Sequence, residues 1–230
     1  MRSRSTETPL LIGSTNRGKL AEIRRALSGL PVTLLTLDDL AVQSRAPETG
    51  ATFLENARAK SLFYSRRTDI LTLAEDSGLE VDGLAGAPGV RSARFAGPGA
   101  GDERNIRKLL RLLKGMPPPK RRARFICCMA LSSRGRLIKV VTGRVRGTIA
   151  LEAKGGNGFG YDPVFRYAPL GRTFAELSAR DKNRVSHRGR ALRKLSAYLA
   201  SRPSVLTGPP EREEGGAPPP FTSRRLRCRR

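Results

Sequence analysis

Apolar residues follow two spacings along this chain, one typical of buried strands and one typical of amphipathic helices. Short apolar or alternating runs predict strands at residues 9–14, 32–37, 70–74, 123–132 and 137–145. The last two runs flank the short polar segment 133–136, which predicts a hairpin turn.

Apolar positions three and four residues apart predict helices between these strands. Such patterns cover residues 19–28, the segment from Thr52 to about residue 66, residues 102–114, and the segment after Ser186. Thr52 and Glu55 have the spacing of a capping box, and Ser186 is a good N-cap. Strands that alternate with helices are typical of an α/β fold.

Changes in composition mark the expected ends of the folded region. Residues 203–230 are rich in proline, glycine, glutamate and arginine, with little to bury. We expect one domain, in one or two lobes, over residues 9–202, with a flexible N-terminus at residues 1–8 and a disordered tail at residues 203–230. Within the domain, the glycine-rich segment 78–101 is predicted to be loop with short structured pieces, and the glycine-rich segment 155–163 is predicted to be a loop.

No apolar run approaches the roughly 20 residues that a membrane-spanning helix needs. The N-terminus is short and polar and has no features of a signal peptide. We therefore expect a cytoplasmic protein with no membrane partner.

The chain is strongly basic, because 44 lysines and arginines face 20 acidic residues and give a formal net charge of +24. Such a charge permits nucleic-acid binding. The basic residues are spread throughout, however, without an aromatic-rich binding motif, so a bias towards arginine explains them and we expect no specific nucleic-acid partner. A basic surface would still attract anionic substrates such as nucleotides. One histidine and three scattered cysteines cannot form a zinc site with the usual spacing.

Gly13 to Lys19 fits G-x-x-x-x-G-K between a predicted strand and a predicted helix, which is a Walker A pattern up to its last position. Leu20 stands where a hydroxyl would contact magnesium, which argues against a P-loop NTPase or kinase. Backbone amides at the helix N-terminus, together with Lys19, would still form an anion cradle. The alternative is that Gly18 only eases a turn.

An acidic pair, Glu75 and Asp76, follows the predicted strand 70–74, at the kind of position where α/β sheets bind ligands. In so basic a chain this pair suggests a divalent cation. The other interpretation is a polar turn formed with Ser77 and Gly78. Sequence alone leaves both open.

Two later segments carry candidate ligand contacts. The glycines of 155–163 would let the backbone approach a ligand while Phe159 and Tyr161 stack on a flat ring, unless the segment is only a tight loop. His187 and Arg188 open the last predicted helix, where they could meet an anion or a carbonyl oxygen. A surface histidine without a role is the alternative, as a solvated lysine is for Lys60.

Together these segments resemble the inosine/xanthosine triphosphate pyrophosphatase family, which cleaves non-standard purine nucleoside triphosphates to the monophosphate and pyrophosphate and so cleanses the nucleotide pool. The matching segments, in the family's order, are residues 14–19, 48–50 with 52–57, 75–79, 86–90 with 92–94, 158–162 and 186–189. The resemblance implies an elongated, mixed central β-sheet flanked by helices, two lobes with the active-site cleft between them, and a homodimer.

The resemblance also implies roles for individual residues. Asp76 would be the catalytic base, and Glu48 and Asp76 would bind Mg²⁺. The implied substrate-binding residues are Ser14, Thr15, Asn16, Arg17, Gly18, Lys19, Lys60, Ser77, Phe159, Gly160, Tyr161, Asp162, Lys182, His187 and Arg188. Asn16, Lys19 and Lys60 would hold the triphosphate, Phe159 to Asp162 would enclose base and sugar, and Lys182, His187 and Arg188 would complete base recognition.

This chain departs from the family pattern at Glu75, where many members have aspartate, and at Arg91, where an aromatic residue is common. Two other classes stay open on the residues alone. One is a P-loop NTPase or kinase, and the other is a non-catalytic nucleotide- or RNA-binding protein.

Overall fold

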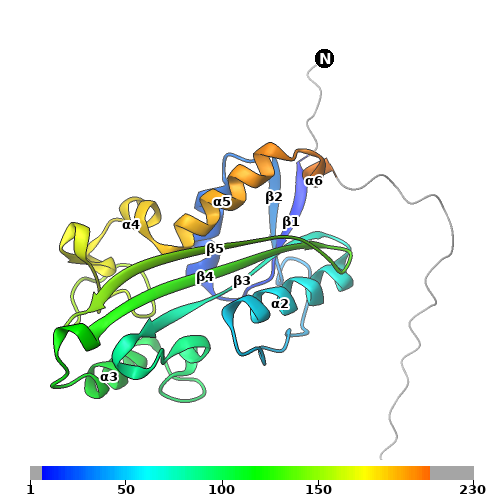
Figure 1. Ribbon diagram of the computed structural model, residues 1–230. Coiled ribbons are helices and arrows are strands. Elements are labelled where there is room, and N and C mark those ends of the chain that lie inside the picture. The colour runs from blue at the N-terminus through cyan, green and yellow to red at the C-terminus, as the bar shows by residue number, and fades with distance from the viewer. Residues whose placement is uncertain (1–6, 208–230) are drawn as a thin grey trace, which may run out of the picture.

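The computed structural model describes residues 7–207 and is built on one seven-stranded sheet of order β2-β1-β3-β4-β5-β6-β7 (Figure 1). The strands are β1 (Thr8–Ile12), β2 (Val32–Thr36), β3 (Leu71–Val81), β4 (Arg122–Ser133), β5 (Arg136–Ile149), β6 (Phe165–Tyr167) and β7 (Arg172–Thr173). β1 is parallel to β2 and β3, whereas β3, β4 and β5 are antiparallel. The sheet is therefore mixed, as predicted.

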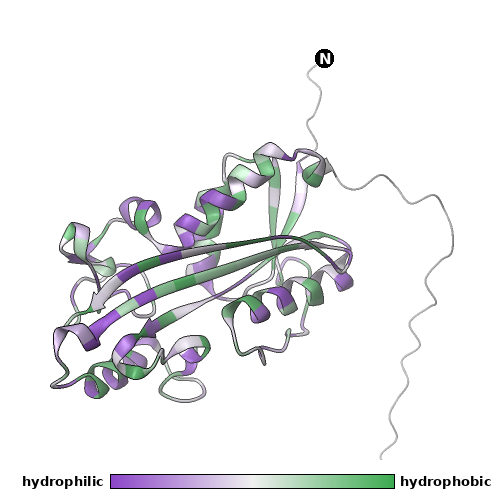
Figure 2. Cartoon of the chain, in the orientation of Figure 1, coloured by the Kyte–Doolittle hydropathy of each residue, from purple (hydrophilic) through white to green (hydrophobic). Residues whose placement is uncertain are grey.

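The helices are α1 (Arg17–Leu27), α2 (Phe53–Thr68), α3 (Asp102–Leu112), α4 (Ala179–Val185), α5 (His187–Ser201) and α6 (Ser204–Thr207). α5 and α2 lie on opposite faces of the long strands (Figure 1). Hydrophilic and hydrophobic residues alternate around both helices, as expected when one side of a helix packs on a sheet (Figure 2). No helix within residues 7–207 is both long and apolar enough to cross a membrane.

Strand alternation assigns the side chains of β4 to two different cores. Cys127 packs with residues of α1 and α5, whereas Cys128 packs with Phe53 and Ala57 of α2. The two adjacent cysteines thus lie on opposite faces, as their place in an apolar run predicts. Both are free thiols.

Most buried apolar residues belong to two large clusters. One joins α1 and α5 to the parallel end of the sheet and includes Ile23 and Leu192. The other joins α3 to the far ends of β3, β4 and β5 and includes Leu109, Phe165 and Phe174.

The strand predicted to end at residue 74 continues to Val81, so the prediction that Glu75 and Asp76 follow its end is wrong. Residues 72–81 pair antiparallel with residues 123–132 of β4, and this long ladder outweighs the local turn preference of Asp76-Ser77-Gly78. β1, in contrast, pairs with β3 only as far as Leu73. The acidic pair therefore lies in the middle of β3, just past the carboxyl end of its parallel neighbour.

Several other boundaries differ from the prediction. Segment 78–101 contains two 3₁₀ helices, Asp82–Leu84 and Gly89–Arg94, which agree with the short structured pieces expected there, but it also contains the end of β3. α4 was not predicted at all. β1 begins at Thr8, inside the segment expected to be flexible. At the other end, α6 places Leu206 in the first core cluster, so the packed region extends past residue 202. The predictions for residues 1–6 and 208–230 lie outside the described residues.

Candidate active site

A cavity of about 490 Å³ opens beside β3, and α1, α2, the loop 155–163 and α5 all contribute to its lining. The predicted site residues that line it are Ser14, Thr15, Asn16, Lys19, Glu48, Lys60, Asp76, Ser77, Phe159, Gly160, Tyr161, Asp162, Lys182, His187 and Arg188. Arg17 is exposed and lies outside the lining. Gly18 lies behind it, where a Cβ atom would come within 2.5 Å of the Phe159 ring.

The turn from β1 into α1 brings a helix N-terminus to the cavity. The Asn16 side chain caps the helix by accepting a hydrogen bond from the Lys19 backbone N–H at 3.0 Å. The first turn of α1 contains no acidic residue, so its free N–H groups and the dipole favour an anion. Leu20, the mismatch to Walker A, packs against the core instead of facing the cavity.

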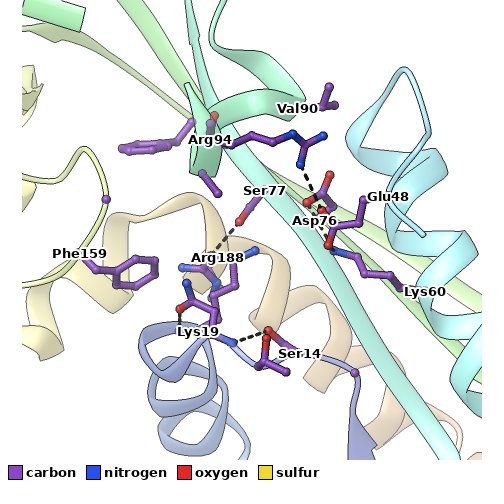
Figure 3. Close-up of a pocket in the computed structure, with 18 of the residues that line it drawn as sticks. Ser14, Lys19, Glu48, Lys60, Asp76, Ser77, Val90, Arg94, Phe159 and Arg188 are labelled. Carbon is purple, nitrogen blue, oxygen red and sulfur yellow. Dashed lines mark hydrogen bonds and ion pairs between the residues drawn. The ribbon is translucent and has the colours of Figure 1, made fainter. Parts of the chain in front are cut away.

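Asp76 points to the α2 face of β3, where a small charged cluster forms (Figure 3). Asn56 donates to Asp76 Oδ2 at 3.0 Å, and Lys60 Nζ lies 3.5 Å from Asp76 Oδ1 and 3.0 Å from Glu48 Oε1. Lys60 is only 7% exposed, so the interpretation of a solvated surface lysine is wrong. Arg94 approaches Glu48 from the other side, with a 4.0 Å separation between Nη1 and Oε2.

The pKa values of Asp76 and Glu48 are shifted in opposite directions. Burial raises the pKa of Asp76, and Lys60, Lys19 and Asn56 offset only part of that effect. Burial would also raise the pKa of Glu48, but there Lys60, Lys19 and Arg94 together outweigh it and the pKa is lowered. Burial thus favours the protonated form of Asp76, whereas its neighbours favour the charged form of Glu48.

Glu75 points to the opposite face of β3, so the two acidic neighbours do not form one unit. Its carboxylate accepts from Arg188 Nε at 2.8 Å and from the Cys127 thiol at 3.0 Å, and it lies 2.9 Å from Lys19 Nζ. Burial opposes the charge of Glu75, yet Arg188 and Lys19 hold its pKa well below the ordinary value. These partners leave Glu75 poorly suited to bind a metal ion.

Arg188 is 2% exposed, and carboxylates occupy most of its donors. It donates to both oxygens of Glu75, to Ser77 Oγ and to Glu22 Oε2, which uses four of its five N–H groups. One N–H is left for a ligand. The role in base recognition that the resemblance implies for Arg188 remains a prediction.

Glu22 of α1 is a site residue that the sequence analysis missed. Its two oxygens lie 2.7 Å from Lys182 Nζ and 2.5 Å from Arg188 Nη1. Burial would raise its pKa, but Arg188 and Lys182 lower it. Only its place one turn after Lys19, on the same side of a predicted helix, could have suggested this position.

Two carboxyl groups hold the glycine-rich loop, the buried Asp162 and the exposed Asp102. Asp162 accepts from the Phe159 backbone N–H at 2.9 Å and pairs with Lys182 at 2.5 Å, while Asp102 accepts from the Gly160 N–H at 2.6 Å. Asp162 thus fixes the loop from within. Burial raises its pKa, and Lys182 only partly offsets this.

Phe159 and Tyr161, predicted to stack on a ligand together, have different surroundings. The Phe159 ring faces the cavity (Figure 3) and lies 4.8 Å from Lys182 Nζ and 5.4 Å from Arg188 Cζ. Tyr161 is packed into the second core cluster, and its hydroxyl donates to the Ser92 carbonyl at 2.9 Å. Phe159 is therefore the residue placed to stack on a flat ring.

His187 is buried, which excludes the interpretation of an idle surface histidine. It is 4% exposed and stacks on Phe125, with ring centroids 4.6 Å apart and an interplanar angle of 12°. Burial, with the nearby Arg188 charge, holds its pKa well below the ordinary value, so the imidazole is neutral. Within residues 7–207 its Nδ1 has no hydrogen-bond partner.

Glu48 and Asp76 are the residues that could hold a divalent metal ion. No three His, Cys, Asp or Glu side chains in the described part of the chain converge on a metal position. Mg²⁺, however, is usually bound through one or two carboxylates together with substrate phosphates and water. Two carboxylates beside Lys60, facing a cavity that also contains a helix N-terminus, fit that requirement.

Fold and cavity together define an α/β protein with a site for an anionic ligand that also carries a flat ring. The model of the Ham1 family matches residues 10–198, and the chain belongs to this family. This match, together with the relatives described next, which are named dITP/XTP pyrophosphatase, confirms the family predicted from the sequence.

Curated relatives match most of the chain. A protein of Syntrophobacter fumaroxidans named dITP/XTP pyrophosphatase is 47% identical over 186 residues, covering 81% of this chain and 79% of the relative. A protein of the same name from Mycolicibacterium paratuberculosis is 49% identical over 199 residues, covering 84% and 96%.

Solved structures agree with this assignment. A HAM1 protein from Coxiella burnetii is 38% identical with a TM-score of 0.78, covering 84% of this chain and 99% of the other. A nucleoside-triphosphatase / dITP/XTP pyrophosphatase from Mycobacterium abscessus is 42% identical with a TM-score of 0.68, covering 82% and 98%.

Proposed function

We propose that this protein hydrolyses non-standard purine nucleoside triphosphates, such as ITP, dITP and XTP, to the monophosphate and pyrophosphate. One observation carries the proposal. The N-terminus of α1 with Lys19 opens onto one cavity, together with Asp76, a carboxylate whose pKa burial raises. The same cavity contains the aromatic ring of Phe159. The relatives named dITP/XTP pyrophosphatase support the choice of substrate.

In this mechanism the phosphates lie between α1 and α2. The N–H groups of α1 and the ammonium groups of Lys19 and Lys60 bind the phosphate oxygens and offset the charge of the leaving group. Asp76 takes a proton from water as the water oxygen bonds to the α-phosphorus. The bond from the α-phosphorus to the bridging oxygen then breaks, and pyrophosphate leaves.

Asn56 and Lys60 position this base. Asn56 donates to one oxygen of Asp76, and Lys60 lies beside the other, so the carboxylate cannot rotate freely. Glu48 and Asp76 would hold Mg²⁺, which supplies a Lewis acid for the phosphate oxygens when it is bound. Glu48 is suited to this because it is partly exposed and its pKa is lowered, so it is ionised at neutral pH.

Selectivity would arise at the other end of the cavity. Phe159 offers a stacking surface, and the neutral His187 can donate from one ring nitrogen and accept at the other. A donor placed at O6 of a 6-oxo purine would meet the amino group of adenine instead, leaving buried polar groups unpaired. ATP should therefore be a poor substrate.

A nucleotide panel with product identification tests the proposal. ITP, dITP, XTP, ATP and GTP are incubated with the protein and Mg²⁺, and pyrophosphate and orthophosphate are measured separately. We expect pyrophosphate from ITP, dITP and XTP, little turnover of ATP, and loss of activity when the metal is chelated. Release of orthophosphate alone would exclude the mechanism. No turnover, with tight and steeply salt-dependent RNA binding, would favour a binding protein instead.

Two further properties belong to this proposal through the family resemblance. They are assembly as a homodimer and a cytoplasmic location. Sedimentation of the purified protein would test the first, and cell fractionation the second.

A further inference from the structure

Six charged side chains form an unbroken line of ion pairs along one side of the cavity, which we call the ion chain, and four of them line the cavity. In order, its members are Lys19, Glu75, Arg188, Glu22, Lys182 and Asp162. The successive contacts are 2.9, 2.8, 2.5, 2.7 and 2.5 Å long, and positive and negative groups alternate throughout.

The ion chain connects the two ends of the proposed substrate site. Lys19 lies in the first turn of α1, where the phosphates are expected. Asp162, at the other end, holds the backbone of Phe159, the proposed stacking residue. The Phe159 ring also contacts Lys182 and Arg188 and lies against Gly18, so it touches the ion chain at several points.

Burial makes these contacts sensitive to one another. The side chains are between 1% and 16% exposed, and three cations face three carboxylates, so the group is neutral and shielded from solvent. Charges in such a place interact strongly and are screened little by salt. A change in pairing at one end therefore alters the pairing at the next member.

Glu22 is the link on which the connection depends. Without its charge the ion chain separates into Lys19–Glu75–Arg188 on one side and Lys182–Asp162 on the other. Each cation would still keep one carboxylate partner. Glutamine at position 22 would also retain an oxygen that accepts hydrogen bonds, so the fold should tolerate this change.

We propose that Glu22 is a positioning residue that couples occupation of the phosphate end of the site to occupation of the base end. The inference rests on the proposed function. A phosphate that draws Lys19 away from Glu75 leaves Arg188 as the partner cation of Glu75. Arg188 then binds Glu75 more closely, and its contact with Glu22 weakens. Glu22 then binds Lys182 more closely, and the support of Phe159 changes with it. Both ends of the site require this same rearranged pairing, so the ligand that binds first carries its cost, and base and phosphates bind better together than apart.

The test uses two halves of the substrate as inhibitors of ITP hydrolysis. Inosine represents the base end and inorganic tripolyphosphate the phosphate end, and each is titrated alone and in the presence of the other. We expect each to tighten the binding of the other by about fivefold or more in the unmodified protein. Glu22→Gln should reduce this factor to less than twofold.

Glu103→Gln is the matched control, because Glu103 has an exposed side chain on α3 and forms an ion pair with Arg107, which is not a member of the ion chain. The Glu103→Gln variant should retain the full factor by which inosine and tripolyphosphate tighten the binding of each other. Should Glu22→Gln fail to melt cooperatively, Lys182→Gln breaks the ion chain at the next contact and must lose the coupling instead.

Independent binding of inosine and tripolyphosphate in the unmodified protein, or full coupling in a folded Glu22→Gln variant, would overturn the inference. Both outcomes leave ITP turnover in place and so differ from failure of the proposed function, in which the unmodified protein releases no pyrophosphate from ITP.

Discussion

At the scale of single residues, Asp76 combines a chemical role with an unfavourable burial. Its raised pKa means that folding disfavours its charged form. Asp76→Asn should lower kcat for ITP by about 10²–10⁴-fold, the usual contribution of a general base. Stability should stay equal or rise, because asparagine can still accept from Asn56 without a buried charge. Steady-state kinetics and thermal melting check both parts.

The exposed Asp82→Asn is the matched control and should change neither quantity. Full activity of Asp76→Asn would remove Asp76 from the mechanism. A large loss of melting temperature would instead show that its charge stabilises the fold.

His187 predicts a particular dependence of stability on pH. Its pKa in the folded state is held well below the ordinary value of 6.5, so a proton binds the unfolded chain more readily. The contribution of His187 to the free energy of unfolding is therefore complete above about pH 6.5. It decreases as the pH falls below that value, by about 1.4 kcal/mol per pH unit. The reference variant is His187→Phe, which can still stack on Phe125.

The measurement is the difference in unfolding free energy between the two proteins from pH 7.5 to 5. His187 is the only histidine in the chain, so contributions from other groups cancel in the difference. A difference that stays constant over this range would mean that the imidazole titrates normally in the folded protein.

At the scale of elements, α5 packs on β5 through Gly143. A Cβ atom there would lie 2.6 Å from the Ala191 backbone nitrogen and would also collide with the His187 carbonyl. Gly143→Ala should therefore push α5 away and destabilise the protein by about 1–3 kcal/mol, the usual cost of overpacking. Activity should fall as well, because His187 and Arg188 open this helix. Chemical denaturation and ITP kinetics measure the two effects.

Gly29→Ala makes the same change where no atom lies within 4 Å of the new Cβ. Its stability should remain within the small range typical of surface substitutions. Equal stability of both variants would show that β5 and α5 can separate freely.

The elements also show how far sequence reasoning extends. Thr52 and Ser186 cap helices as predicted, because their hydrogen bonds depend only on residues within one turn. β3 was predicted too short, because its second half is stabilised by pairing with β4, a segment about 50 residues away in the chain. Local preference for a turn at Ser77 and Gly78 carries no information about that partner.

The site was predictable to a similar degree. Most of the family-matched residues line one cavity, but their partners follow from tertiary packing. Glu22 and Cys127 belong to no motif, and only the approach of α1, α5 and β4 brings them to Glu75 and Arg188. The division of Glu75 and Asp76 between two faces could have been inferred from alternation once β3 was known to continue.

At the scale of the whole molecule, the two ends of the described fold are joined. Leu206 of α6 is buried in the first core cluster, and the Thr8 hydroxyl donates to the Leu206 carbonyl. A chain that ends after Arg202 should therefore melt several degrees below one that ends after Thr207. Loss of the buried Leu206 side chain should lower the free energy of unfolding by about 1.5–3 kcal/mol.

Calorimetry of the two truncated proteins, with Leu206→Ala in the longer one, measures this effect. Leu206→Ala should account for most of the difference. Identical melting temperatures of the two truncated proteins would place α6 outside the cooperative unit.

The ion chain also limits how this part of the molecule can evolve. Each inner member lies between two groups of opposite charge, so a reversed charge at one of them would face a like charge on both sides. Substitutions there are consequently epistatic, because a change that harms the protein alone becomes tolerable when a neighbouring opposite charge is removed with it. Evolution along this line therefore proceeds in compensating pairs, drawn from helices and a strand that are distant in sequence.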